Sequence, residues 1–414
     1  MTIIIGIIKL LIILCIVATV HEFGHFIAAK LFKIGVNEFS IGFGPKIFQK
    51  KIKETMYSLR WIPLGGYVVI DGEGEESDKP NSFSKKNTLQ KIIVLVMGVI
   101  FNLILAFIIL MSISFRVPTF TTEITKFTEN SALEQAGIQI GDVITKINDK
   151  KVTIGQDMLS DEYTNNQNTK IEYIRNSKTN VITITNAVKD VGYIGASFSN
   201  NGDNGRNKIE TVRGGKSAEK AGLKSGDTIL EVENISVIKA ADVINIIKQN
   251  ANKEIELKID RKGEILIKKI TPQFQKQFNL GIADTKKIDT NFMYAFDKSV
   301  KIVGSVVDSY VSLFKGKVTL DDVSSIVGIG VVVSETNGML EYLNILAIIS
   351  LAVGAANILP FPPLDGGKII LILIEAVTRK KIPLKVEAII SYIGFGLLFL
   401  LTIIVTFKDI LRIL

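Results

Sequence analysis

The chain has 414 residues, 47% of them hydrophobic, and a positive mean hydropathy of +0.33. Its length allows about two to four domains, and its composition excludes a wholly soluble protein of ordinary make-up. The formal net charge of +8 would suit nucleic acid. The basic residues form no compact stripe interleaved with aromatic residues, however, so we expect no nucleic acid partner.

Four apolar stretches reach the length of about 20 residues that a membrane-spanning helix needs. They run over residues 2–32, 91–115, 342–374 and 386–407. The first stretch lacks the basic start of a cleaved secretory signal and continues into a charged motif, so we expect a retained span. The fold class predicted is a polytopic α-helical membrane protein with four transmembrane helices, which makes the lipid bilayer a partner.

Basic residues are concentrated in two loops, residues 33–90 between the first two spans and residues 376–386 between the last two. Because an excess of Lys and Arg marks cytoplasmic loops, both are expected in the cytoplasm, and the region between the second and third spans is expected outside it. Cys15, the only cysteine, lies in the first span. Cysteine usage therefore does not indicate whether the protein faces an oxidising or a reducing compartment.

The loop after the first span has the composition of a small β-sheet. Residues 39–51 and 55–70 are rich in β-branched and aromatic residues and are punctuated by glycines. These features predict strands or hairpins, which follow the transmembrane region directly in the chain. Residues 1–115 are accordingly treated as one domain that holds the first two spans and this sheet.

Between the second and third spans the sequence repeats itself. The pattern S-A…A-G-(I/L)-x-x-G-D-x-I starts at Ser131 and recurs at Ser217. Each copy continues into an alternating run typical of a strand. The copies also end alike, in Tyr193-Ile194-Gly195-Ala196 and Leu280-Gly281-Ile282-Ala283. The repeat predicts two mixed α/β modules, residues 116–200 and 201–286, and resembles the PDZ domains of bacterial membrane and envelope proteases.

A connector, residues 287–338, is expected between the second module and the third span. Within it, residues 291–315 carry apolar side chains at helical spacing. Such spacing is typical of an amphipathic helix at a membrane surface, and also of one face of a helix in a soluble core. We expect an amphipathic connector at the membrane surface, followed by residues 339–414 with the last two spans.

His21-Glu22-Phe23-Gly24-His25 is an H-E-x-x-H motif at the end of the first span. Its spacing puts both imidazoles on one helix face, where they can bind one zinc ion with Glu22 near the attacking water. Zinc lowers the pKa of such a water to about 7, and the carboxylate can accept its proton. These are the only histidines, and ionisable groups in a membrane span are usually functional. The motif predicts a zinc metalloprotease.

Hydrolytic zinc usually takes three protein ligands, and with no further histidine the third should be a carboxylate. Asp365 is the best candidate. It follows three prolines and precedes two glycines inside the third apolar stretch, where they must interrupt a helix. Broken backbone at membrane depth is tolerated where it is buried in protein or lines a wet cavity. Without the first motif, an ordinary turn aspartate would be an equally good interpretation.

The pair H-E-F-G-H and N-x-x-P-x-P-x-L-D-G resembles the site-2 protease family of intramembrane zinc metalloproteases. The resemblance implies His21, His25 and Asp365 as ligands of Zn²⁺ and Glu22 as the general base. It further implies that Asn357 contacts substrate or stabilises the oxyanion. The segment Pro63-Leu64-Gly65-Gly66-Tyr67-Val68 is similar to the family's membrane-associated β-loop, so Gly65, Gly66 and Tyr67 are expected to hold substrate as an added strand.

One segment departs from the family pattern. Where the family commonly has Ser-Gly-Pro-Val-Gly-Ile before the third span, this chain has Ser324-Ser325-Ile326-Val327-Gly328-Ile329. The departure leaves the metal motifs untouched but removes any family inference about this segment's conformation.

The Gly98-x-x-x-Asn102 pattern in the second span also resembles a family feature, in which small residues allow close helix packing.

The resemblance implies a metalloendopeptidase of the bacterial inner membrane that cleaves single-span membrane proteins, namely trimmed anti-sigma factors or remnant signal peptides. The PDZ modules would lie outside the cytoplasm, exclude untrimmed substrates and have the capacity to bind peptides or C-termini. Two alternatives stay open: a catalytically idle PDZ adaptor, and a metal transporter or sensor. The adaptor has no reason to keep ionisable groups in lipid, and the transporter needs no general base such as Glu22.

Overall fold

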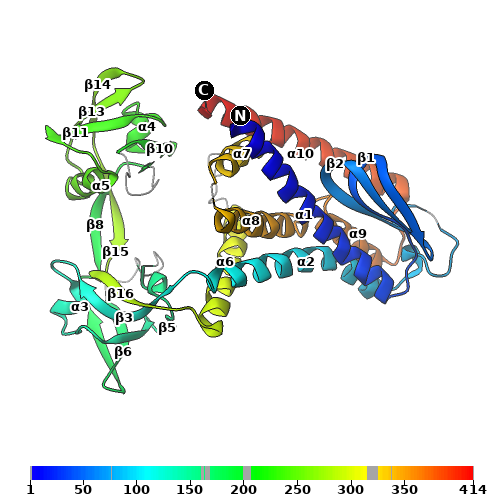
Figure 1. Ribbon diagram of the computed structural model, residues 1–414, viewed down its shortest axis with the longest axis horizontal. Coiled ribbons are helices and arrows are strands. Elements are labelled where there is room, and N and C mark those ends of the chain that lie inside the picture. The colour runs from blue at the N-terminus through cyan, green and yellow to red at the C-terminus, as the bar shows by residue number, and fades with distance from the viewer. Residues whose placement is uncertain are drawn as a thin grey trace. The chain divides into compact units, whose positions relative to one another are not determined.

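The computed structural model describes residues 2–75, 77–159, 163, 168–198, 207–314, 325–336 and 338–413. The chain divides into two compact units (Figure 1). The membrane unit comprises Met1–Val117 and Thr290–Leu414, and the inserted unit comprises Pro118–Asp289. Each unit has its own buried clusters of apolar side chains.

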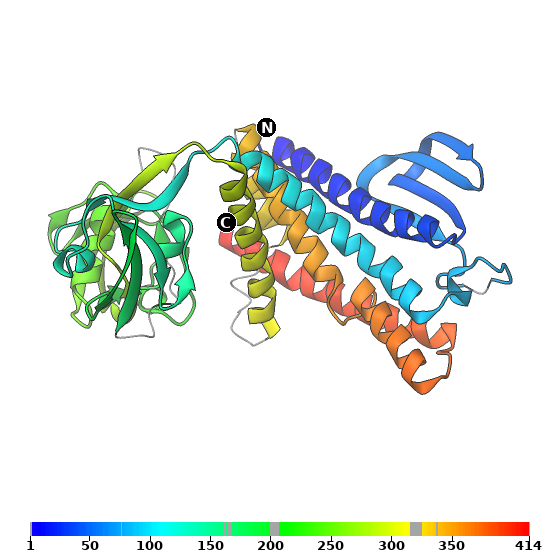
Figure 2. The same cartoon turned by 90° about the horizontal axis from the view of Figure 1, so that it is seen from below.

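Four helices of the membrane unit are long and apolar enough to cross a bilayer, counted over the described residues. They are α1 (Thr2–Leu31), α2 (Thr88–Ser114), α8 (Met339–Asn357) and α10 (Leu384–Ile413). Helix α2 packs against both α1 and α8, and Figure 2 shows α2 running beside them. The prediction of four helices long and apolar enough to span a bilayer is confirmed.

The third apolar stretch differs from its predicted bounds, 342–374. Helix α8 ends at Asn357, and a separate helix α9 (Asp365–Thr378) follows after seven residues. Pro360, Pro362 and Pro363 lie in this break, as expected, because proline has no N–H to donate and disfavours a helical residue before it. With 14 residues α9 is too short to span a bilayer, and Asp365 is its first residue.

The predicted strands after α1 are present as β1 (Val36–Ile52) and β2 (Thr55–Ile70). Both strands bend, so that Phe39 of β1 lies opposite Tyr57 on one side and Val68 on the other. In the described part of the chain, residues 66–70 pair only with β1, so they form an edge of the sheet. Strand β2 also packs against α1.

The sheet exposes a large apolar surface, as expected for a membrane-associated element. Its exposed apolar side chains are Ile41, Phe43, Ile47, Phe48, Ile52, Leu59, Trp61, Ile62, Leu64 and Val69. Trp61, the only tryptophan of the chain, is 68% exposed. A short 3-10 helix, η1 (Phe83–Lys85), leads from the sheet region into α2.

The expected connector contains helices α6 (Phe292–Phe314) and α7 (Ile326–Glu335). One face of α6 packs through Ile302, Val303 and Val306 against buried residues of α2 and α8. Other apolar residues of α6 are exposed, including Met293 at 71%. The helix is therefore apolar on more than one face. Of the segment that departs from the family pattern, Ser324 lies outside the described residues, and Ser325 caps α7.

The inserted unit contains two α/β modules. The first is built from β3 (Thr119–Phe127), α3 (Ala132–Gln135), β4 (Val143–Ile147), β5 (Lys150–Lys151), η2 (Gly155–Leu159), β6 (Thr169–Arg175), β7 (Lys178–Ile184) and β16 (Ile282–Ile288). The second is built from β9 (Ala196–Phe198), β10 (Ile209–Val212), α4 (Ser217–Lys220), β11 (Thr228–Val232), β12 (Ile235–Ser236), α5 (Ala240–Gln249), β13 (Ile255–Arg261) and β14 (Glu264–Ile270). A two-stranded antiparallel ribbon of β8 (Val188–Tyr193) and β15 (Gln273–Phe278) links them.

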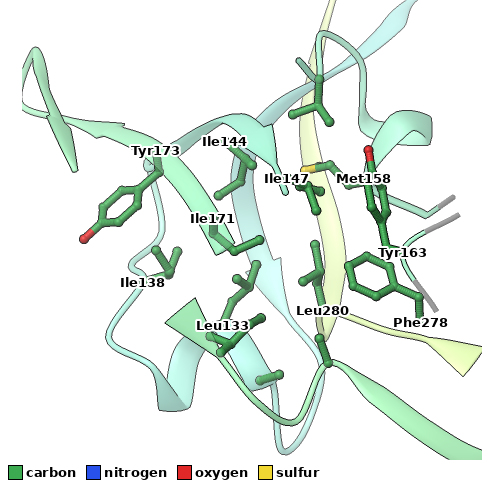
Figure 3. Packing of buried hydrophobic residues seen from close by; sticks show 14 of the residues in the cluster. Leu133, Ile138, Ile144, Ile147, Met158, Tyr163, Ile171, Tyr173, Phe278 and Leu280 are labelled. Carbon is green, nitrogen blue, oxygen red and sulfur yellow. The ribbon is translucent and has the colours of Figure 1, made fainter. Parts of the chain in front are cut away.

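The two copies of the repeat exchange their ends. Ile194, from the end of the first copy, is buried in the core of the second module. Phe278 and Leu280, from the end of the second copy, are buried in the core of the first, against Leu133 and Ile147 (Figure 3). The predicted boundary between residues 200 and 201 therefore does not separate the modules. The second module, residues 194–272, is inserted into the first.

Backbone hydrogen bonds repeat this exchange at equivalent positions. The Thr128 N–H donates to the Gly281 carbonyl (2.9 Å), and the Arg213 N–H donates to the Gly195 carbonyl (2.8 Å). Both glycines have positive φ, +78° and +81°, where a side chain is disfavoured. The glycine-containing endings are interchangeable in sequence, and the ribbon of β8 and β15 determines which core each one enters.

The repeated Gly-Asp turns have a structural explanation. In the first module, Arg175 donates to both carboxylate oxygens of Asp142 (2.8 and 2.6 Å). In the second, Arg261 does the same with Asp227 (2.7 and 2.8 Å). Each carboxylate also accepts from a backbone N–H three residues earlier, at Gln139 and Lys224. The Asp of each repeat thus closes its own turn and pairs with a strand arginine.

Candidate metal centre

The two histidines lie one turn apart on α1 and project from the same face. Both are 6% exposed, and their Nε2 atoms are 3.1 Å apart. Helical spacing of four residues produces this arrangement. The close packing of α1 on α2 requires Gly98, because a Cβ there would lie 2.5 Å from His25 Cε1 and 2.8 Å from His21 Cε1.

Asp365 meets the histidines from the far end of the chain. Its Oδ2 lies 2.9 Å from His21 Nε2 and 3.3 Å from His25 Nε2, and the residue is 9% exposed. The break before α9 turns the chain so that the first residue of this helix faces α1. Gly366 and Gly367 allow the break to pack tightly, because a Cβ on either would collide with the backbone of residues 358–362.

The donor set fits zinc. Among the described residues, one group of side chains has the ligand atoms and the spacing to hold a metal ion. It consists of His21, His25 and Asp365, whose ligand atoms all lie within 4.8 Å of one another, and all three residues are buried. Tetrahedral zinc with ligands at about 2.0–2.1 Å separates neighbouring ligand atoms by about 3.3 Å, close to the distances found. A buried carboxylate beside two imidazoles is the kind of donor set found in hydrolytic zinc sites.

The outer nitrogens of the imidazoles meet α2. His25 Nδ1 lies 2.8 Å from the carbonyl oxygen of Val94, which can only accept, so this nitrogen carries the hydrogen and leaves Nε2 free as a ligand. His21 Nδ1 lies 3.4 Å from the side-chain amide of Asn102, which is fully buried. A backbone carbonyl acting in this way is not visible in a sequence.

Glu22 connects the metal centre to the sheet. Its Oε2 accepts a hydrogen bond from the Val68 N–H (3.0 Å), in the edge segment of β2. The side chain is half-buried and belongs to the same turn of α1 as His21 and His25. The expected base therefore lies between the metal donors and an open strand edge.

The remaining predicted residues lie at two other places. Asn357 is the last residue of α8, and its Nδ2 donates to the Val353 carbonyl (3.0 Å). Gly65 and Gly66 lie where β2 packs against Ala18 and Thr19 of α1, and Tyr67 stacks on Phe43. The structure thus brings together the metal donors and Glu22. The substrate roles of the four other residues stay predictions.

Helix α9 is held by an ion pair that the sequence did not predict. Lys368, three residues after Asp365, lies with its Nζ 2.7 Å from Glu73 Oε1 in the loop after β2. This bond ties the helix that carries Asp365 to the segment that leaves the edge strand. A lysine close behind the expected ligand in an apolar stretch was the available signal.

This fold and donor set define a membrane-embedded metalloprotease. The family model described as peptidase family M50 matches residues 9–401. The chain is 31% identical to regulator of sigma E protease from Haemophilus influenzae over 438 residues, covering 97% of this chain and 98% of that one. A candidate zinc metalloprotease from Fusobacterium nucleatum is 30% identical, covering 87% and 86%. The chain belongs to peptidase family M50 and is a zinc metalloprotease.

Proposed function

We propose that this metalloprotease cleaves single-span membrane proteins within or near their spans, with zinc held by His21, His25 and Asp365. The observation that carries the proposal is the meeting of these three donors from α1 and α9 inside a bundle of apolar helices. Polar donors gathered at membrane depth are costly unless they serve a function.

Zinc bound there supplies Lewis-acid polarisation of the scissile carbonyl and activates a water molecule. Glu22 would accept a proton from the attacking water at a carboxylate oxygen and deliver it to the leaving amine. The Val68 N–H, which donates to Glu22, fixes the orientation of the carboxylate. Asn357, at the end of α8, would bind the substrate backbone or the oxyanion.

The test is cleavage of a tagged single-span substrate by wild type and by Glu22→Gln, at equal protein and zinc content. We expect a loss of product of about 100-fold or more, the usual contribution of a general base. Zinc content should not change, because Glu22 is not a ligand. Equal product from both proteins would contradict the assignment. A wild-type protein without zinc would favour the adaptor interpretation.

We further propose that substrate is held as an added strand along residues 66–70. A helical peptide bond is shielded by its own hydrogen bonds, and pairing with an open sheet edge extends it. Val68→Pro removes the edge N–H that also donates to Glu22, and Val68→Ala retains it. Cleavage of a membrane-spanning substrate should fail in the first variant and persist in the second, with zinc retained in both. A short, already extended peptide separates the two roles: if Val68→Pro still cleaves it, strand addition was lost, and if not, Glu22 was disturbed. Cleavage by Val68→Pro at the wild-type rate would exclude strand addition at this edge.

The modules of the inserted unit are proposed to be PDZ domains that admit only trimmed substrates. Support comes from the repeated Gly-containing loops and from a cavity of about 260 Å³ in the second module, lined by β9, α5 and the ribbon of β8 and β15. A peptide or exposed C-terminus would bind there. One relative's name, regulator of sigma E protease, favours anti-sigma factors as substrates, with remnant signal peptides as a second class.

The proposed orientation follows the basic loops. Residues 33–90 and 376–386 would face the cytoplasm of a bacterium, with the enzyme in the inner membrane and the inserted unit outside the cytoplasm. This orientation puts the inserted unit on the side where a membrane protein would be trimmed before the intramembrane cut.

A further inference from the structure

The Asn102 side chain is fully buried beside His21 and has no role in the chemistry described above. Its Nδ2 lies 3.4 Å from His21 Nδ1, and its Oδ1 has no hydrogen-bond partner. An unpaired buried amide oxygen is unfavourable by about 1–3 kcal/mol. An amide in such a position calls for an explanation.

The metal geometry fixes which nitrogen of His21 carries the hydrogen. Nε2 faces Asp365 Oδ2 (2.9 Å) and His25 Nε2 (3.1 Å), so Nε2 is the nitrogen available to a metal. A neutral imidazole that binds through Nε2 carries its hydrogen on Nδ1 and needs an acceptor there. An Nδ2 donor facing Nδ1–H would place two donors against each other.

Rotating the amide by 180° about its Cβ–Cγ bond removes the conflict. Oδ1 then accepts from His21 Nδ1–H, and Nδ2 takes the place of the oxygen, at almost no change in shape. Either orientation leaves one amide atom without a partner, but only the rotated one supplies the acceptor that the imidazole requires. The buried amide oxygen thereby gains a partner.

Helix α2 is built to hold this contact. Val94, Gly98 and Asn102 follow one another at intervals of four residues, and so lie along one face of the helix. Val94 supplies the acceptor for His25, Gly98 gives room for both rings, and Asn102 faces His21.

Helix α8 fixes Asn102 from the other side. Ser350 Oγ donates to the backbone carbonyl of Asn102 (2.9 Å). A Cβ at Gly354 would lie 3.3 Å from Asn102 Cβ, so the glycine allows α8 to approach closely. These contacts hold the α2 backbone at Asn102 against α8, and the side chain projects from that fixed point beside His21.

We propose that Asn102 is a positioning residue that accepts the His21 Nδ1–H hydrogen bond and so presents Nε2 to zinc. The proposal rests on the zinc ligands proposed above. It assigns Asn102 and Val94 equivalent tasks: each supplies the oxygen acceptor that selects the Nδ1–H form of one histidine.

The first experiment measures zinc affinity of the full-length protein in detergent by competition with a chromophoric chelator. Asn102→Leu should weaken binding about 10- to 100-fold, the usual effect of losing an outer partner of a ligand. Asn102→Asp, which accepts but does not donate, should bind within about threefold of wild type. Ser299→Ala, a buried change on α6 whose hydroxyl donates to the Ala295 carbonyl, is the control and should bind like wild type.

Two results would overturn the proposal. Wild-type affinity in Asn102→Leu would mean that the amide does not act on the metal ligand. If Asn102→Asp bound zinc as weakly as Asn102→Leu, Asn102 would act as a donor, with its Nδ2 facing His21 Nδ1 in the unrotated orientation. Failure of wild type itself to bind zinc would instead contradict the proposed ligand set.

The second experiment does not depend on how the variants fold. The chain has two histidines, so labelling with ¹⁵N-histidine gives four ring nitrogens in the NMR spectrum of the zinc-loaded protein. We expect protonated Nδ1 on both rings, and removal of zinc should shift both Nε2 signals. A His21 ring protonated on Nε2 while zinc shifts the His25 signal would exclude the proposed role of Asn102.

Discussion

In the inserted unit, the buried carboxylates of Asp142 and Asp227 each face an arginine, whereas in the membrane unit the buried carboxylate of Asp365 faces two imidazoles. The first two are paired with a permanent positive charge and hold a turn to a strand. Asp365 forms a donor set that a cation would complete. A buried carboxylate paired with arginine marks the scaffold, and a buried carboxylate beside two imidazoles marks the site.

The largest effect on activity, as distinct from stability, should come from removing the inserted unit. The Thr290 hydroxyl donates to the Val117 carbonyl (2.6 Å), so the two ends of the membrane unit meet and a short Gly-Ser linker can replace residues 118–289. If this unit excludes untrimmed substrates, cleavage of an intact single-span substrate should rise about tenfold or more, equivalent to about 1.4 kcal/mol. Gel analysis of the products would measure this increase. If the shortened protein still did not cleave intact substrate, the proposal that the inserted unit excludes untrimmed substrates would be contradicted.

The next effect tests the exchange of ends between the modules. Deleting residues 201–286 removes Phe278 and Leu280 from the first core, and losing one buried Phe alone is destabilising by about 3–5 kcal/mol. Replacing residues 194–272 with Asn-Gly joins Tyr193 to Gln273, which are already paired across the ribbon. Limited proteolysis should digest the first module only in the first variant. If both variants resisted the protease equally, the first copy of the repeat would complete its core with its own ending and not with the ending of the second copy.

A smaller effect is expected from Arg175→Met, which leaves the Asp142 carboxylate, 2% exposed, without its partner. Breaking such a pair should lower the free energy of unfolding by about 3 kcal/mol at pH 7. Denaturant unfolding of residues 118–289 would measure it. Asp149→Asn, which breaks an exposed pair with Lys170, is the control and should change stability by less than about 0.5 kcal/mol.

The same pair predicts a pH dependence. Burial raises the pKa of Asp142, but hydrogen bonds from Arg175 and from the Gln139 N–H outweigh it and hold the pKa below its usual value. The pair therefore stabilises the fold above the unfolded pKa of about 3.9, and this stability is lost as the pH falls further. The difference between wild type and Arg175→Met should shrink below about pH 4. A difference that stays constant with pH would contradict this.

The smallest effect concerns a pair whose charges are inverted between the modules. Lys146 lies opposite Glu172 on β4 and β6, and Glu231 lies opposite Lys258 on β11 and β13. Lys146→Glu should be destabilising by about 0.5–1 kcal/mol, because it puts like charges opposite each other. Adding Glu172→Lys should restore most of that loss, as measured by urea unfolding. No recovery in the double variant would mean that the pairing contributes nothing.

Local spacing in the sequence was enough to predict several parts of this protein. Apolar runs fixed four spanning helices, H-E-x-x-H fixed two imidazoles on one helix face, and prolines fixed the break before Asp365. The repeat also indicated two similar modules. Each of these follows from the period of a helix, the alternation of a strand or the missing N–H of proline, and none requires knowledge of distant contacts.

Tertiary structure alone decided which distant groups meet. The Val94 carbonyl and the Val68 N–H are backbone atoms that every residue has, so no side chain in the sequence marks their contacts with His25 and Glu22. The exchange of ends cannot be read from the sequence either, because the two endings have the same pattern. Only the pairing of β8 with β15 selects one arrangement, and only the packing of α1, α2 and α9 brings Asp365 within reach of His21.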